Sequence, residues 1–421
     1  MPQAQGSLVA FKSLMEPSFN KAHTGAITGK SKKIYYESTT LSGSRGMDTS
    51  KLMRGGTRHP TSGIPGNYDV AGSIPTELMA SSFMWLAALG SCEVVNTGAT
   101  MGTALTTPAG VIDPTKQTLT VTATAHGMAI GDSVEIAGLT APTSLNGKIY
   151  PVIEVASTDI FTLRIQMDVT STFTLGTGTI KKVGTGTTNN VYTYKAGGNI
   201  PSYILEKGIT DIATPKYFKY TGVKCGKFSF SVGASGVVSL STDWMGAQEA
   251  INAASFDTGT AIDNSKISFN AAHIASGDLK IGGVASSIIK KVDIALDNQL
   301  DGDSFCVGSG GVRCGIAAQT YQITGSISAV FEDTALIELA LAQTTTSLEL
   351  YFKRGTGAGT TNNEYCQIVI PELKFSHKTP DIPGPAGLMV DLSFTGEYTA
   401  NADATAMKVV IGTPQLPGAV F

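Results

Sequence analysis

The sequence predicts a mainly β protein, an antiparallel β-sandwich with a flanking α-helix and a small inserted β domain. In YQITGSISAVFED (321–333), every second residue from Tyr321 to Phe331 is apolar or glycine, and those between are mostly hydroxylic. The chain contains 48 glycines, and 15% of its residues are charged, against about 25% in typical globular domains. Strand-like runs are separated by Asn-Gly, Gly-Asp and Gly-Thr-Gly, which supply the positive φ angles that hairpins need.

Size and charge narrow the class of protein. The 421 residues suggest two or three domains at about 150 residues each. A net charge of −3 disfavours tight, charge-driven binding of nucleic acid. A surface with so few charges suits a chain that covers itself with copies of itself. The start of the chain lacks the apolar core of a secretory signal, and no apolar run is long enough to span a membrane, so we expect a soluble protein made in a cytoplasm.

The first part of the chain combines a strand, an arm and a helix. Residues 33–39 predict a strand. Residues 42–67 are rich in glycine, serine and basic residues without periodicity, which predicts a long exposed loop or arm. Residues 73–90 predict the best-defined helix of the chain, with Pro75 in its first turn and Gly90 at its C-terminal cap. The basic residues of the arm are Arg45, Lys51, Arg54, Arg58 and His59.

A change in the sequence pattern indicates an insertion at residues 113–183. Short strands alternate there with glycine turns, and residues 97–112 and 184–198 read as linkers or loops. We therefore expect a main domain formed by residues 1–112 and 185–421, with residues 113–183 as a small β domain in one of its surface loops. Insertion at such a loop costs little free energy.

Strands dominate the remainder of the chain. A second helix is expected at 333–343, where Asp333 is suited to cap the N-terminus. The alternation along the strands predicts an antiparallel sheet or sandwich with one solvent-exposed face. The expected strands are 216–232, 236–246, 290–300, 321–333, 346–354, 365–378, 388–398 and 407–412.

No motif predicts catalysis, a cofactor or a metal site. TGAITGKS (24–31) lacks the first glycine and the preceding strand of a phosphate-binding loop, so a glycine-rich turn is the favoured interpretation. His126 is a tempting general base, but no partner pattern accompanies it, and a turn histidine is favoured. Asp297, Asp301 and Asp303 resemble part of a calcium loop without its closing glutamate, which favours a polar turn.

The five cysteines are an odd number and include no CxxC pair. This pattern favours reduced, mostly buried thiols. A disulfide between Cys306 and Cys314, across the stretch VGSGGVR, is the less favoured alternative.

Several segments, taken in order, resemble the tail tube proteins of long-tailed bacteriophages. The resemblance covers about residues 1–112 and 185–421. The segments are EPSFN (16–20), the helical stretch SIPTELMASSFMWLAALG, SFSVGASGVVSLSTDWMG, a strand ending at Asn298, the strand 323–333 leading into a helix, and Ile370 to Ile382 before the last strands.

This resemblance implies a structural virion protein. Such subunits join their sheets edge to edge into hexameric rings with a β-barrel lumen, and the rings stack into a hollow tube that conducts DNA to the host. The polar strand faces would line the lumen without binding DNA specifically. Asp391 and Glu397 are expected there from the alternation, and the arm at 42–67 is expected to contact the next ring.

The resemblance also implies the setting. The expected partners are further copies of the chain and the tape measure, terminator and distal tail proteins of the virion, which is assembled in the host cytoplasm. The inserted domain resembles a small β module of phage structural proteins, through H-G-M-A-I-G-D-S-V (126–134), L-N-G (145–147) and F-T-L (161–163). It should project outward, where it cannot block the bore.

Other functions stay open at this point. The same scaffold serves tail terminator, baseplate or decoration proteins, and the tube of a contractile tail or an injection device. A virion enzyme that cleaves glycans or peptidoglycan would need a pair of acid and base carboxylates in a groove, and no stretch suggests one. Residues 113–183 alone could be a module that binds host glycans, but a structural ornament is the favoured interpretation.

Overall fold

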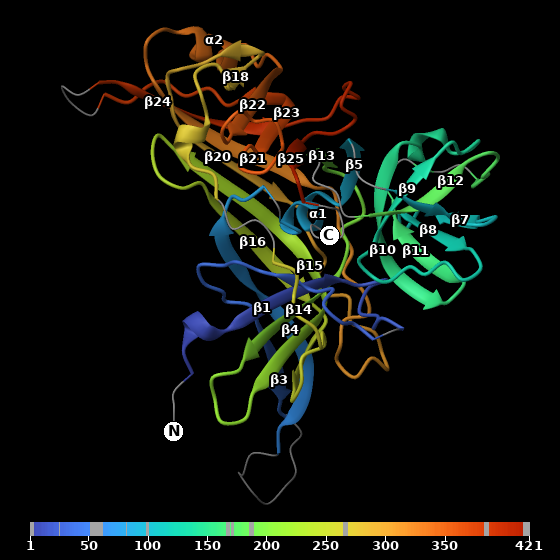
Figure 1. The fold of residues 1–421 in the computed structure, drawn as a ribbon. Helices are drawn as coiled ribbons and strands as arrows, with labels where there is room; N and C mark the ends of the chain where they lie inside the picture. The colour runs from blue at the N-terminus through green and yellow to red at the C-terminus, as the bar shows by residue number, and fades with distance from the viewer. Residues whose placement is uncertain are drawn as a thin grey trace, which may run out of the picture.

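A computed structural model describes residues 4–24, 26–50, 62–80, 82–97, 101–165, 169, 172–184, 189–263, 268–382 and 387–415. Within them the chain is mainly β, with antiparallel ladders and few helices, as predicted (Figure 1). The first layer is an antiparallel sheet with the order β4 (Ile64–Glu77), β16 (Ser239–Gly246), β15 (Lys216–Gly233), β20 (Ile289–Asp297), β21 (Gln322–Val330) and β24 (Met389–Gly396).

A second layer packs on the apolar face of the first. Its order is β18 (Leu279–Ile281), β22 (Thr346–Lys353), β23 (Tyr365–Phe375), β25 (Lys408–Thr413), β13 (Asn189–Lys195) and β5 (Ser91–Thr97), with β19 (Val284–Ala285) beside β18. Buried side chains from both layers, among them Phe228, Leu296, Ile327, Phe352 and Ile368, form one hydrophobic core. The arrangement is the β-sandwich that the alternation predicts.

The first half of β15 continues into a third sheet. This sheet has the order β2 (Lys32–Lys33), β1 (Ala10–Met15), β14 (Tyr203–Ile209), β15 and β17 (Gln248–Asn252). Of the strand expected at 33–39, only residue 33 lies in β2. Short 3₁₀ turns occur at Gly6–Leu8, Thr143–Leu145 and Ala271–His273.

Both expected helices exist, but the first is much shorter than predicted. Helix α1 spans Met84–Leu89 and ends at Gly90, whose φ of 80° forms the expected cap. Residues 73–77 are instead part of β4 and pair with β16. Val70, Ile74, Thr76 and Leu78 are buried, so this stretch also carries a period of two, and pairing with β16 prevails over its helical pattern.

Helix α1 contacts β15 of the first layer and β13 and β5 of the second. All six of its residues are buried. The side-chain amide of Asn298 donates to the carbonyl oxygens of Ala88 and Cys225, at 3.0 and 3.1 Å, and so joins the helix to β15. Helix α2 spans Ala335–Leu341, and its N-cap residue is Thr334 rather than Asp333, although the carboxylate of Asp333 accepts the N–H of Ala335.

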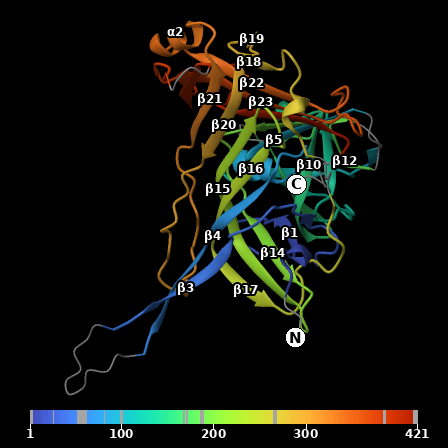
Figure 2. The ribbon, with the colours of Figure 1, turned by 90° about the vertical axis from the view of Figure 1, so that its left-hand side faces the viewer.

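The described residues at the two ends of the predicted arm pair as antiparallel strands rather than forming an irregular loop. Strand β3 (Ser42–Asp48) pairs with residues 64–71 of β4, and the pair extends away from the sandwich (Figure 2). The sequence of these strands shows little alternation of apolar and polar residues. They pair nevertheless, because the hydrogen bonds of a β-ladder are made by backbone groups. We call β3 and residues 62–71 the arm.

A second hydrophobic cluster lies beside the sandwich (Figure 1). The strands around it follow the order β6 (Met101–Ala104), β12 (Thr179–Val183), β9 (Ser133–Ala137), β10 (Lys148–Ser157), β11 (Ile160–Arg164), β8 (Thr118–Thr122) and β7 (Ala109–Asp113). Because β6 and β7 pair with these strands, we propose that the inserted unit begins near residue 101 rather than 113.

Candidate functional site

The solvent-facing side of the first layer is a continuous polar surface. Alternation along each strand turns apolar residues into the core, so their hydroxylic and charged neighbours gather on the other side. Cross-strand pairing aligns them in rows, one of which contains Ser239, Ser231, Asp293, Ser326 and Ser393. We call this side the polar face. It is hollowed, with a volume of about 720 Å³ between its strands.

Asp293 lies near the middle of the polar face and is held by its neighbours. Its carboxylate accepts from the hydroxyls of Ser231 and Ser326, at 2.5 and 3.3 Å, and lies 2.8 Å from the ammonium group of Lys291. Burial tends to raise the pKa of Asp293, but the hydrogen bonds from Lys291 and Ser231 outweigh it and hold the pKa below its usual value. The carboxylate is therefore ionised at neutral pH.

Carboxylates outnumber ammonium groups in the aligned rows of the polar face. Asp243, Asp293, Asp297 and Asp391 lie there, while the lysines in the same rows are Lys227 and Lys291. Hydroxyl groups occupy most of the other positions. Such a surface offers a polyanion neither the cluster of cations nor the aromatic platforms that hold nucleic acid.

The structure places the two predicted lumen residues differently. Asp391 is exposed on the polar face, opposite Ser328, whose hydroxyl donates to its carboxylate. Glu397 lies just beyond the end of β24, and its carboxylate is 3.1 Å from the ammonium group of Lys374 on β23. Asp391 therefore lies near the start of β24, and Glu397 lies just past its end.

Of the predicted arm residues, only Arg45 lies within the described part of the chain. Its guanidinium group donates to the carbonyl oxygen of Gly66 at 2.9 Å and lies 4.5 Å from the ring centroid of Tyr68. Lys51, Arg54, Arg58 and His59 lie outside the described residues.

The segment that resembles a phosphate-binding loop does hold an anion, but one from its own chain. The buried carboxylate of Asp257 accepts the backbone N–H groups of Gly29, Lys30 and Ser31 at 2.6, 3.0 and 2.7 Å. Burial tends to raise the pKa of Asp257, but hydrogen bonds from Ser31 and these amides hold it below its usual value. The glycine-rich turn is therefore occupied by a structural contact.

The other tempting polar residues also have structural partners. His126 accepts the N–H of Met128 at 2.9 Å and its second ring nitrogen lies 3.1 Å from the carbonyl oxygen of Ser157, as expected of a turn histidine. Asp297 and Asp301 accept the N–H groups of Gln299 and Asp303. In the described part of the chain, no group of three or more histidine, cysteine, aspartate or glutamate side chains is placed to hold a metal ion.

The expectation for the cysteines is wrong at one pair. Cys306 and Cys314 are joined by a disulfide, which the odd count and the absence of a CxxC pair did not indicate. Their Cα atoms lie 5.9 Å apart because the intervening loop turns back on itself. Cys92, Cys225 and Cys366 are free thiols, and burial raises the pKa of each.

A buried arginine fixes the inserted unit to the sandwich. Arg164, on β11, donates to the carbonyl oxygens of Gly90 and Asn199 of the main body, as well as to Gln117 beside it. Burial lowers the pKa of Arg164 to about 10. Asp132 adds a contact 3.4 Å from the ammonium group of Lys30. The unit is therefore held in one orientation.

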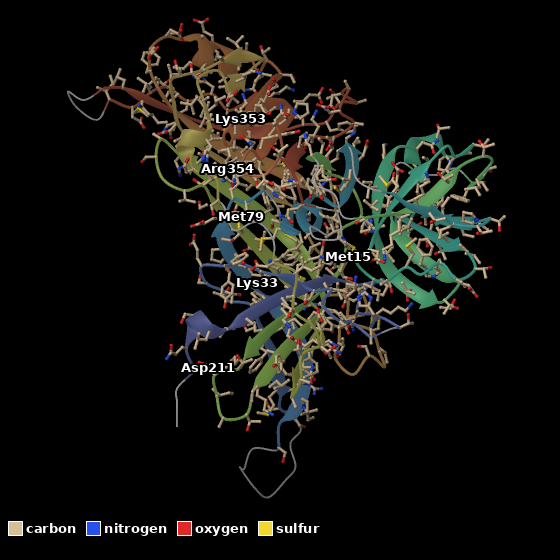
Figure 3. The ribbon with its side chains drawn as sticks, in the orientation of Figure 1. Met15, Lys33, Met79, Asp211, Lys353 and Arg354 are labelled. Carbon is tan, nitrogen blue, oxygen red and sulfur yellow. A yellow bond between two sulfur atoms is a disulfide. The ribbon has the colours of Figure 1, made fainter. Side chains whose placement is uncertain are left out.

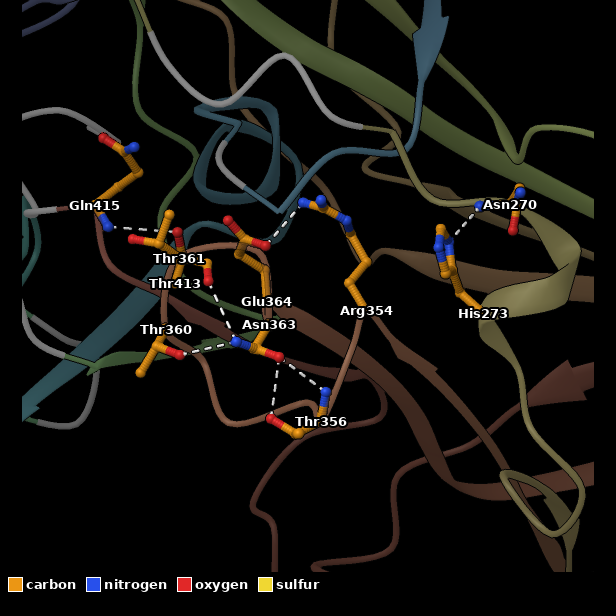
Figure 4. Close-up of polar contacts among 10 residues, drawn as sticks. All are labelled: Asn270, His273, Arg354, Thr356, Thr360, Thr361, Asn363, Glu364, Thr413 and Gln415. Atoms are coloured by element: carbon orange, nitrogen blue, oxygen red, sulfur yellow. Dashed lines mark hydrogen bonds and ion pairs between the residues drawn. The ribbon is translucent and has the colours of Figure 1, made fainter.

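An ion pair organises the hairpin loop between β22 and β23. Figure 3 labels Arg354 in the upper part of the molecule, near Lys353. Its guanidinium group is 2.7 Å from the carboxylate of Glu364, and their side chains are only 13% and 6% exposed. Beside them, Asn363 accepts the N–H and hydroxyl of Thr356 (Figure 4). Burial and the neighbouring Arg354 lower the pKa of His273.

Comparison with known proteins gives one match. The family model described as "Phage tail tube protein" matches residues 6–396. A search of curated proteins finds no match. No helix in the described ranges is long and apolar enough to cross a membrane.

Proposed function

The chain belongs to the phage tail tube protein family, and we propose that it forms hexameric rings that stack into the tube conducting phage DNA to the host. It is a structural protein of the virion tail, in a family whose members assemble into an oligomeric tube. The observation that carries the proposal is the hollowed polar face. Its hydroxyls and carboxylates suit a bore through which DNA slides without being held.

Ring closure requires two sheet edges that can join. Along β24, residues 389–392 have a ladder partner on one side, β21, and none on the other side among the described strands. At the opposite edge of this layer, β4 is bordered by residues 35–40, through hydrogen bonds from Glu37 to Pro75 and from Thr40 to Ser73. If the free side of residues 389–392 in one subunit joined the edge formed by β4 and residues 35–40 in the next, repetition around a ring would give a closed barrel.

In this assembly Asp391 would lie on the wall of the bore. Glu397, beyond the strand end, would lie nearer its rim. The arm would contact the next ring, the inserted unit would project outward, and the ends of the tube would meet the tape measure, terminator and distal tail proteins. Assembly would take place in the host cytoplasm.

Cryo-electron microscopy of the purified protein tests this function. We expect stacked sixfold rings with a central bore, with Asp293 on its wall and the inserted unit outside. Single closed rings would indicate a terminator instead. A bore lined by another sheet would contradict the role of the polar face.

Deleting the inserted unit should leave ring formation intact. Thr97 and Asn189 lie opposite each other in the β5–β13 pair, so residues 98–188 replaced by Asn-Gly would close a two-residue hairpin. The buried Trp85 and Trp244 both belong to the main core, so fluorescence would report whether that core folds. Electron microscopy would then show thinner rings. A folded variant that remains monomeric would contradict this prediction.

A further inference from the structure

A cavity of about 280 Å³ lies at the junction between the main body and the inserted unit, and we call it the junction cavity. Figure 3 labels Met15, which lines it, on the side of the main body beside the inserted unit. Its volume lies at the lower end of the range of ligand pockets, so only a small ligand would fit. The main body contributes residues 15–19, 199–202 and Lys224, and the inserted unit contributes Thr118, Ile153 and Arg164.

Two cationic side chains line the junction cavity without a carboxylate partner among the described residues. Arg164 is 8% exposed, and its Nε atom is buried with no hydrogen-bond partner in the described part of the chain. The ammonium group of Lys224 donates to the carbonyl oxygen of Ile316 at 2.8 Å. The acceptors of the Arg164 guanidinium are likewise neutral: the carbonyl oxygens of Gly90, Lys116 and Asn199 and the side-chain amide of Gln117.

The two cations also repel each other. Burial lowers the pKa of Arg164 to about 10. Burial and the charge of Arg164 lower the pKa of Lys224 to about 8, against the opposing effect of Glu16. The two groups are therefore close enough to interact in a place with little water. An anion bound beside them would be stabilised by both charges.

The other charged residues of the junction cavity are already engaged. Glu16 accepts the backbone N–H groups of Asn20 and Gly222, both at 2.9 Å. Burial raises the pKa of Glu16 to about 7, although Lys219 acts in the opposite direction, so this carboxyl group is partly protonated at neutral pH. The ammonium group of Lys116 lies 2.9 Å from the carboxylate of Asp113. The charges of Arg164 and Lys224 are therefore not balanced within the described part of the chain.

The rest of the cavity wall is largely apolar. The ammonium group of Lys224 lies 5.8 Å from the ring centroid of Phe19, so charged and apolar parts of the wall adjoin. Such a wall favours a ligand that combines one anionic group with a short apolar chain over an inorganic anion. The apolar lining residues are Met15, Pro17, Phe19, Ile153, Ile200 and Pro201.

We propose that the junction cavity binds a small aliphatic carboxylate, with its negative charge beside Lys224 and Arg164. The cavity shares no lining residue with the hollow of the polar face, so this inference does not rest on the proposed function. Because the main body and the inserted unit both line the cavity, a ligand there would contact both and stabilise their junction.

Isothermal titration calorimetry of the full chain with hexanoate at pH 7 tests the site. We expect hexanoate to bind at one site per chain. Hexanol lacks the charge and inorganic phosphate lacks the chain, so each should bind at least about tenfold more weakly. Hexanol binding as tightly as hexanoate would overturn the role of the cations, and equally tight phosphate binding would overturn that of the apolar wall. A lack of hexanoate binding would overturn the site itself.

Two variants and a control locate the bound hexanoate. Lys224→Met removes the ammonium group and should weaken binding about tenfold. Ile153→Phe keeps both cations but fills the cavity, and should abolish binding. Lys21 does not line the cavity, and its ammonium group lies 3.1 Å from Glu154, so Lys21→Met should bind as the wild type does. Fluorescence of Trp85 and Trp244 reports whether each variant folds. Unchanged binding in folded Lys224→Met and Ile153→Phe would overturn the proposal.

The pH dependence tests the site without any substitution. Between pH 6 and pH 9, Glu16 loses its proton near its pKa of about 7 and Lys224 near its pKa of about 8, while Arg164 stays charged. The cavity therefore becomes less positive, whereas hexanoate remains ionised throughout. We expect its affinity for the wild-type chain to fall at least about tenfold over this range. An affinity that is constant or rises with pH would contradict a carboxylate bound beside Lys224.

Discussion

Replacing Arg354 by methionine should destabilise the sandwich by about 3 kcal/mol, because it leaves the carboxylate of Glu364 buried without its cation. Glu364 is only 5% exposed, so water cannot replace the lost partner without opening the β22–β23 loop. Urea unfolding followed by tryptophan fluorescence should show a lower midpoint with an unchanged slope.

An exposed ion pair provides the control. Lys378 and Asp381 lie 3.2 Å apart, with side chains 52% and 82% exposed. Lys378→Met removes the same kind of contact in water and should change the stability by less than about 0.5 kcal/mol.

Removing both buried charges gives the second check. In Arg354→Met/Glu364→Leu neither charge remains, so we expect much of the lost stability to return. Equal losses in Arg354→Met and Lys378→Met would contradict the role of the buried pair. A double variant less stable than Arg354→Met would show that the two side chains matter mainly through their packing.

The sandwich could be predicted because its strands carry their own pattern. From 216 to 413 the predicted strands agree with β15, β16 and β20–β25 to within a few residues, since one face of each strand is buried and the other is wet. The arm lacked this signal, because both faces of β3 are largely exposed. At 73–77 the helical and strand patterns coincided, and only pairing with β16 decided between them.

Contacts between residues far apart in the sequence could not be predicted in this way. Arg313 meets Asp69 across 244 positions, and Asp257 meets Gly29 across 228. No local spacing connects such partners, and a single arginine in a glycine-rich loop has no distinctive pattern. The sequence favours a glycine-rich turn at 24–31, but it does not show the carboxylate of Asp257 that accepts the N–H groups of this turn.

The buried side chain of Lys32 marks a position where a substitution should stabilise the protein. This side chain is 1% exposed, and its ammonium group has no hydrogen-bond partner among the described residues. Burial, reinforced by the neighbouring Lys30, lowers the pKa of Lys32 to about 7. The adjacent Lys33 is exposed and lies over the ring of Tyr35. Substitution of Lys33 is therefore the control for substitution of Lys32.

Replacing Lys32 by methionine should therefore raise the stability by roughly 2–4 kcal/mol below pH 7, since one pKa unit corresponds to about 1.4 kcal/mol. Between pH 7 and the unfolded pKa of 10.5, the unfolded wild type binds more protons than the folded one, so its stability rises with pH. The advantage of Lys32→Met should shrink over that window.

Thermal unfolding of both variants from pH 6 to pH 10 measures this effect. Lys33→Met should stay within about 0.5 kcal/mol of the wild type throughout, as surface substitutions usually do. A Lys32→Met protein that is less stable than the wild type, or whose advantage does not change with pH, would show that Lys32 is charged and paired in the folded protein. A gain confined to pH below 10 would identify burial of an unpaired ammonium group as the cause, because only that cost disappears when the lysine loses its proton in both states.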